Sequence, residues 1–124
     1  MKYFESQKYK SSDYKQFSVF STNDNPFYYF FLPITSLMWI KCGYKPLIFL
    51  FANQKKWESK QYIIDITLQM GANIAFIDDN IIQSNPNLRK YEKSTLAQIS
   101  RLCPNCFPDI DKKGYCLTSD IDML

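Results

Sequence analysis

The chain has 124 residues, of which 46% are hydrophobic and 17% aromatic, so it carries enough apolar material for one compact domain and is not intrinsically disordered. Its net charge of +3 is small and scattered, which argues against a nucleic-acid partner. Histidine is absent, and this excludes histidine as an acid, a base or a metal ligand.

Residues 1–16 are predicted to be a polar N-terminal arm. A solvated arm is favoured over an anchor for an anionic surface, because Glu5 and Asp13 offset part of the positive charge of its lysines. No secretory signal is visible, and prolines and lysines interrupt the apolar stretch Pro26–Ala52, so no transmembrane span is predicted. We therefore expect a cytoplasmic protein with a single α/β domain over residues 17–124.

The first predicted strand is Phe17–Phe20, an apolar run that ends in the polar loop Ser21–Asp24. Asn25-Pro26 is typical of a helix start, since asparagine caps the helix and proline fits its first turn. Gly43 is typical of the residue that follows a helix. The segment between them predicts a largely buried helix, disturbed near Pro33 because proline has no amide hydrogen to donate.

The second predicted strand, Leu47–Phe51, is continuously apolar, as in a strand covered on both faces of a parallel sheet. The segment Ser59–Met70 fits both a strand and a helix. We predict a helix, because its first serine can cap the start and Gly71 can close the end. The third strand is Asn73–Ile77, another apolar run.

The last predicted helix opens at Pro86 and is stopped by Pro104 and Pro108. Gly114 then introduces the final strand, Tyr115–Leu117. The order βαβαβαβ predicts a Rossmann-like, three-layer α/β fold with a four-stranded, mostly parallel sheet and helices on its faces. The apolar stripe of the last helix consists of Leu88, Tyr91, Thr95, Ile99 and Leu102.

Polar residues follow every predicted strand. In open α/β sheets, ligands bind in the crevice at the carboxyl ends of the strands. The pattern therefore places four polar loops around one candidate site, although the same residue types are also common in turns and caps. The residues are Ser21, Thr22, Asn23 and Asp24; Asn53 and Gln54; Asp78 and Asp79; and Asp120 and Asp122.

Asp120 and Asp122 come directly after the last strand. Residues two apart in an extended segment point to the same side, so these carboxylates can converge on one divalent cation. Two carboxylates at such a short distance repel each other, which is unfavourable unless a positive charge compensates them. Mg²⁺ or Mn²⁺ held in this way also binds phosphate oxygens. A metal and nucleotide site is one interpretation, and a solvated acidic segment is the other.

This order of elements resembles the nucleotide-sugar-binding half of the A-type (GT-A) glycosyltransferases. The resemblance rests on a helix with Arg89, Lys90 and Lys93, followed by an apolar strand that runs into the motif Ser119-Asp120-Ile121-Asp122. It covers nearly the whole chain after the arm. It implies a domain that binds a nucleotide-diphosphate sugar as donor, with Mn²⁺ or Mg²⁺ as cofactor.

The resemblance also implies roles for single residues. Asp122 would be the direct metal ligand, and Asp120 would contact the ribose or the metal. These enzymes continue with an acceptor-binding half that holds the catalytic base, so the chain is expected to be truncated, poorly active and without an assignable base or acceptor. The other implied positions are Ser21, Thr22 and Asn23 near the nucleotide, Asp78 or Asp79 near the base, and Arg89 or Lys93 near the phosphates or sugar.

Two other function classes remain open. The first is a non-catalytic α/β binding or oligomerisation module, since the exposed edge of an incomplete sheet favours pairing with a second copy. The second is a zinc module, in which the pair Cys103 and Cys106 would be joined by Cys42 and Cys116. A zinc ribbon needs a second Cys-x-x-Cys, which is missing. Without a secretory signal, reduced and unpaired cysteines are expected.

Overall fold

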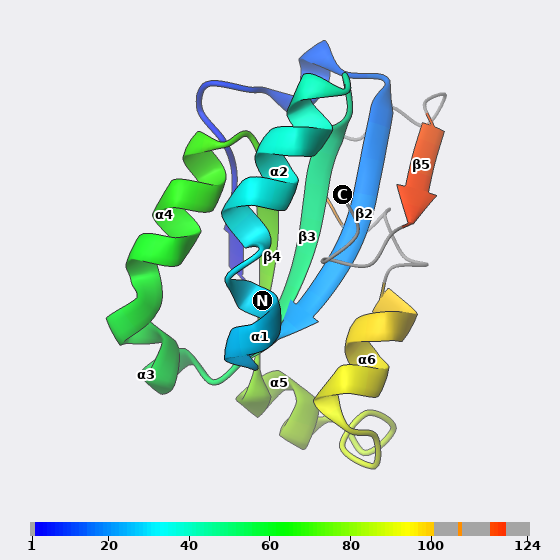
Figure 1. Cartoon of the computed structure of the whole chain (residues 1–124). Coiled ribbons are helices and arrows are strands. Elements are labelled where there is room, and N and C mark those ends of the chain that lie inside the picture. Colours follow the sequence, from blue (N-terminus) through cyan, green and yellow to red (C-terminus); the bar gives the residue numbers. More distant parts are fainter. Residues whose placement is uncertain (1, 101–106, 108–114, 119–124) are drawn as a thin grey trace.

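The computed structural model describes residues 2–100, Phe107 and residues 115–118, and these residues form an α/β fold (Figure 1). Within them, one sheet has five strands in the order β1-β4-β3-β2-β5. The parallel strands are β2 (Gln16–Asn23), β3 (Lys45–Ala52), β4 (Asn73–Asp78) and β5 (Tyr115–Thr118), and β1 (Lys2–Phe4) is antiparallel to β4. The α/β class is therefore confirmed, but the sheet is mixed and five-stranded instead of four-stranded.

The extra strand β1 lies in the segment expected to be a solvated arm. Side chains of the sheet hold the residues that follow it. The buried Asn73 accepts a hydrogen bond from the Ser6 amide at 2.9 Å and donates one to the Ser11 hydroxyl at 2.9 Å. Ser11 begins the short 3-10 helix η1 (Ser11–Asp13). The strand was missed because three half-exposed residues give no apolar run.

A buried lysine ties the same N-terminal segment to the sheet. Lys45, the first residue of β3, is completely buried and donates hydrogen bonds to the carbonyl oxygens of Gly71, at 2.6 Å, and of Tyr9. Burial disfavours the ammonium form and lowers the pKa of Lys45 to about 8, against a weaker opposing effect of Glu5. The residues between β1 and β2 are thus part of the folded unit.

The segment between β2 and β3 forms two helices, α1 (Pro26–Tyr29) and α2 (Leu32–Lys41), and not one. The predicted disturbance near Pro33 is therefore a break. As predicted, the Asn25 side chain caps α1 by accepting from the Phe27 amide at 3.0 Å. Gly43 follows α2 with φ +87°, which favours glycine.

The connection from β3 to β4 contains α3 (Gln54–Trp57), the 3-10 helix η2 (Glu58–Lys60) and α4 (Gln61–Gln69). The helix predicted over this segment is confirmed, and Gly71 ends it with φ +107°. The predicted cap is wrong: Lys60, and not Ser59, is the N-cap of α4, and its side chain makes no capping bond. Ser59 is instead held within η2, where its hydroxyl donates to the Lys56 carbonyl at 3.2 Å.

The connection from β4 to β5 contains α5 (Asp79–Ser84) and α6 (Lys93–Ser100). The short helix α5 was not predicted, because Asp78 and Asp79 resemble a polar loop. The helix expected to open at Pro86 begins later, at Lys93, and turns fill the residues in between. Its predicted continuation to Leu102 lies outside the described residues.

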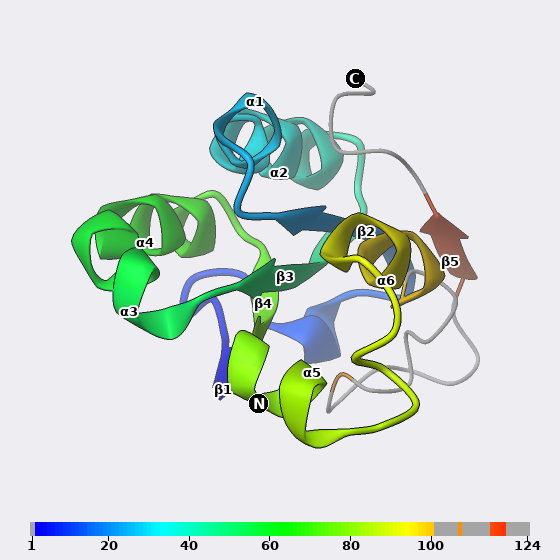
Figure 2. The ribbon, with the colours of Figure 1, turned by 90° about the horizontal axis from the view of Figure 1, so that it is seen from below.

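Helices cover both faces of the sheet, and each face has its own apolar core (Figures 1 and 2). On one face α2 and α4 pack against the sheet and against each other, and on the other face α6 packs against β2 and β3. Successive strand residues alternate between the two cores. The first core includes Phe20, Leu32, Ile48, Ile64 and Ile74, and the second includes Phe17, Val19, Leu47, Phe49 and Leu96.

Candidate functional site

The order of the parallel strands reverses beside β2. The chain passes from β2 to β3 and then to β4 on one side of β2, whereas β5 pairs with its other side. In the β2–β5 pair, Val19 is opposite Thr118, the last residue of β5. In open α/β sheets, ligands bind in the crevice outside the carboxyl ends of the strands at such a reversal, and we call this position the β2–β5 crevice. Asp120 follows Thr118 by two residues in the sequence, but Asp120 and Asp122 lie outside the described residues.

The polar residues Ser21, Thr22 and Asn23 belong to the last part of β2, which is longer than the predicted strand. The Ser21 hydroxyl donates to the Ala97 carbonyl oxygen and so attaches α6 to β2. Thr22 is buried, and its hydroxyl donates to the Asn23 carbonyl at 3.2 Å. The Asn23 side chain accepts from the Asn25 amide at 2.9 Å. These bonds shape the end of the strand and leave the Asn23 side chain partly exposed.

Asp78 and Asp79 lie where β4 ends and α5 begins. A carboxylate oxygen of Asp78 accepts from the Gln54 amide at 3.0 Å and joins the end of β4 to the start of α3. Both aspartates are partly exposed. Because neighbouring strands are roughly 4.8 Å apart, β4 lies on the order of 10 Å from β2, a separation that an extended ligand such as a nucleotide can bridge.

The two basic residues lie in the connection between α5 and α6. Arg89 is exposed in a turn, where its backbone amide donates to the Asn85 carbonyl at 3.0 Å. Lys93 is the first residue of α6. Since α5 directly follows β4 and Ser21 attaches α6 to β2, the segment with Arg89 connects the end of β4 to the helix on β2.

Within the described ranges, no group of three or more Cys, Asp or Glu side chains is arranged to hold a metal ion. Cys42 and Cys116 are exposed free thiols, and partial burial raises the pKa of the Cys116 thiol. Cys103 and Cys106 lie outside the described residues. The predicted metal ligands and the Cys-x-x-Cys pair are therefore predictions that the structure does not test.

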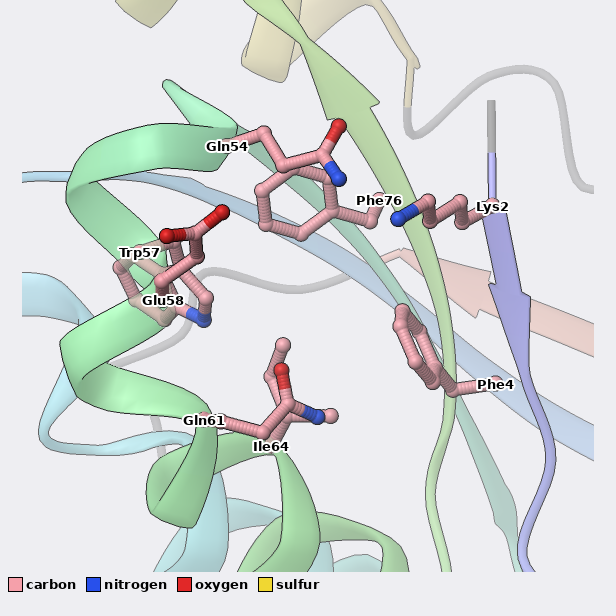
Figure 3. A pocket seen from close by; sticks show the side chains of 8 residues that line it. All are labelled: Lys2, Phe4, Gln54, Trp57, Glu58, Gln61, Ile64 and Phe76. Atoms are coloured by element: carbon pink, nitrogen blue, oxygen red, sulfur yellow. The ribbon is translucent and has the colours of Figure 1, made fainter.

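A pocket of about 270 Å³ lies at the β1–β4 edge of the sheet, whereas β2 and β5 are at its other end (Figure 3). Its walls come from β1, β4, α3, η2 and α4. Sequence reasoning missed it, because two of its eight lining residues, Lys2 and Phe4, belong to the unpredicted strand β1. The lining residues are Lys2, Phe4, Gln54, Trp57, Glu58, Gln61, Ile64 and Phe76.

A second feature is an apolar surface on α1 and α2, where a largely buried segment was expected. Phe27 is 82% exposed, Phe30 64% and Ile34 52%, and they lie in α1, directly after α1 and in α2. The buried face of α2 instead carries Thr35 and Ser36. The prediction failed because the segment is apolar nearly all round, so its pattern does not show which face meets the sheet.

None of the helices in the described part of the chain has the length and apolar character that crossing a bilayer requires. Comparison with protein-family models, with curated proteins and with solved structures gave no match.

Proposed function

We propose that the chain binds a nucleotide-diphosphate sugar through a divalent cation, as the donor-binding part of a metal-dependent, GT-A-like glycosyltransferase with a Rossmann-like sheet. One observation carries the proposal. β5 pairs with β2 instead of extending the sheet beyond β4, and the segment Ser119-Asp120-Ile121-Asp122 follows it directly. The acidic motif therefore comes after the strand that creates the reversal, where open α/β sheets bind ligands.

The chemistry of the motif suits the proposed ligands. Asp120 and Asp122 supply hard carboxylate oxygens, which Mg²⁺ and Mn²⁺ prefer together with phosphate oxygens. The bound cation would neutralise the charge that develops on the diphosphate leaving group. Asp122 is assigned to the cation and Asp120 to the cation or the ribose. The acceptor and the catalytic base remain unassigned.

The described residues give the donor two further supports. The Ser21 bond to Ala97 fixes α6 against β2, and the positive charges of Arg89 and Lys93 belong to the segment that enters α6. A basic segment next to the crevice attracts the phosphates. Beyond β3, at the end of β4, one carboxylate oxygen of Asp78 is bound to the Gln54 amide. Its second oxygen is offered as an acceptor for an N–H group of the nucleobase.

Thermal unfolding with nucleotide diphosphates and Mn²⁺ tests the proposal. A ligand at about a hundred times its Kd stabilises the fold by about 2.7 kcal/mol, which raises the melting temperature by several degrees. Asp122→Ala should abolish the rise. Asp13→Ala, which removes an exposed carboxylate far from the crevice, should keep it. A rise that is the same without Mn²⁺, or that survives Asp122→Ala, would contradict the metal-dependent site.

The second candidate is a non-catalytic binding or oligomerisation module in which the α1–α2 face meets a second copy. It is favoured by the exposure of Phe27, Phe30 and Ile34, because apolar patches of this kind commonly mark interfaces. No melting shift with any nucleotide diphosphate, together with a concentration-dependent dimer in light scattering, would support it over the first. The zinc module is separated from both by elemental analysis of the purified protein. For the first proposal we also expect a cytoplasmic location, where the cysteine thiols stay reduced.

A further inference from the structure

The pocket beside β1 has an apolar interior and a polar rim (Figure 3). Trp57, Ile64 and Phe76 form the interior, and each is at most 4% exposed. Figure 3 shows the face of the Phe76 ring at the back of the pocket, with Phe4 on the β1 side. Lys2, Gln54, Glu58 and Gln61 surround the opening.

The interior contains one polar group that the fold does not use. Trp57 is 2% exposed, and its indole nitrogen Nε1 is buried without a hydrogen-bond partner within the described residues. The ring is held by an edge contact with Tyr29, with centroids 5.0 Å apart, and by the Lys60 ammonium 5.6 Å from its centre. In Figure 3 the nitrogen lies on the side of the ring that is turned toward Ile64 and Gln61. A buried donor left unpaired is unfavourable, so an acceptor that reaches Nε1 from the pocket would be favoured.

The rim offers both kinds of hydrogen-bonding group and no excess charge. Lys2 donates, Glu58 accepts, and the amides of Gln54 and Gln61 do both. A ligand with several hydroxyl groups can meet all four, because each hydroxyl donates and accepts. Lys2 and Glu58 carry opposite charges, so the rim has no net charge that would favour an anion or a cation. The rim is therefore suited to a neutral polyhydroxylated ligand.

We propose that this pocket binds one pyranose ring of a neutral saccharide. The apolar C–H face of the ring would lie against Phe76 and Trp57, a ring or hydroxyl oxygen would accept from Trp57 Nε1, and the remaining hydroxyls would bind the rim. The volume of about 270 Å³ is slightly below that of pockets for drug-sized ligands, about 300–1,000 Å³, and suits a single ring. The site is separate from the β2–β5 crevice and does not depend on nucleotide binding there.

Nuclear magnetic resonance of the indole N–H groups tests this directly, because the chain has two tryptophans, Trp39 and Trp57. Trp57→Phe assigns the two signals and keeps an aromatic ring in the core. Methyl pyranosides of glucose, galactose, mannose and N-acetylglucosamine serve as probes, and glycerol and leucine as comparison ligands. With one of the pyranosides, the Trp57 signal should shift and saturate in the millimolar range, about 4 kcal/mol of binding, while the Trp39 signal stays in place.

Two glutamines of α4 provide a matched pair of variants. Gln61→Ala should weaken the pyranoside affinity about tenfold, as expected for the loss of about 1.4 kcal/mol of hydrogen bonding, whereas Gln69→Ala should not, because Gln69 is exposed outside the pocket. Asp122→Ala should also leave the shift intact, so failure of the nucleotide proposal would not affect this one. The saccharide proposal would be overturned by a Trp57 signal that no pyranoside moves, that leucine moves instead, or that shifts equally in Gln61→Ala.

Discussion

Buried polar groups near the β1 edge of the sheet differ in their hydrogen bonding from those near the β5 edge. Near the β1 edge, Asn73 and Lys45 are buried and both bind the N-terminal segment. Asn73 makes one hydrogen bond with Ser6 and one with Ser11, and Lys45 donates to the Tyr9 carbonyl as well as to the Gly71 carbonyl. On the side toward β5, the Ser18 hydroxyl in the middle of β2 is also buried, yet no hydrogen-bond partner for it is found among the described residues. Within the two parallel strands β2 and β4, the buried Asn73 thus fixes the N-terminal segment, whereas the buried Ser18 hydroxyl makes no such bond among the described residues.

The largest expected effect concerns Lys45. Its pKa is about 8 in the fold and 10.5 when exposed, so between these values the unfolded chain binds more protons than the folded chain. The free energy of unfolding should therefore rise with pH from about 8 to about 10.5, by up to roughly 3 kcal/mol, and this gain should be absent below about pH 8.

Denaturant unfolding of the wild type and Lys45→Met across this pH range measures the effect. Tyrosines and other groups titrate in both proteins, so the difference between their slopes isolates Lys45. Equal slopes would show that the buried ammonium does not lose its proton in this range, and that the Tyr9 and Gly71 carbonyls hold it charged.

The next effect concerns Asn73. Asn73→Ala leaves the Ser6 amide without its acceptor and the Ser11 hydroxyl without its donor, and should destabilise the fold by about 2 kcal/mol. Asn80→Ala, at an exposed position of α5, should change the stability by less than about 0.5 kcal/mol. Chemical denaturation measures both. A small effect of Asn73→Ala would mean that the attachment of the N-terminal segment contributes little to the free energy of unfolding.

A smaller effect of opposite sign is expected on the β5 side. Ser18→Ala removes a buried hydroxyl that has no partner among the described residues, so the fold should gain about 1 kcal/mol. The same substitution at the exposed Ser12 serves as control and should be nearly neutral. Destabilisation by Ser18→Ala would reveal that the hydroxyl is hydrogen-bonded after all, and the contrast between the two sides would disappear.

The smallest effect on stability is expected at the α1–α2 face. Phe27 and Phe30 are mostly exposed, so the double variant Phe27→Ser/Phe30→Ser should change the unfolding free energy by less than about 0.5 kcal/mol per site. It should nevertheless lower the apparent mass in light scattering if this face joins two copies. Tyr62→Ser, at an exposed position of α4, controls for a general change in surface character. An unchanged mass distribution would show that this face does not mediate self-association.

The sequence was sufficient to predict what depends on local patterns. The continuously apolar Leu47–Phe51 predicted a central buried strand, and Gly43 and Gly71 predicted helix ends where the backbone does adopt positive φ. Both inferences depend on a few adjacent residues. The acidic motif at Asp120 and Asp122 was noticed for the same reason, since its chemistry is concentrated in one short segment.

The sequence was not sufficient where a feature depends on distant residues. β1 is recognisable only from its pairing with β4, which lies about seventy residues further along the chain. The pocket combines residues of β1, α3, η2, α4 and β4, and no single segment shows it. The exposed face of α1 and α2 was missed because an evenly apolar helix gives no sign of its orientation.

The position of β1 also has a consequence for the order in which the chain acquires its structure during synthesis. Lys2, Tyr3 and Phe4 are synthesised well before their partners Phe76, Ala75 and Ile74. Strands β2, β3 and β4 can associate as they emerge, because neighbouring segments pair with the smallest loss of chain entropy. We therefore expect β1 to dock after this sheet has formed, and its docking completes the wall of the pocket.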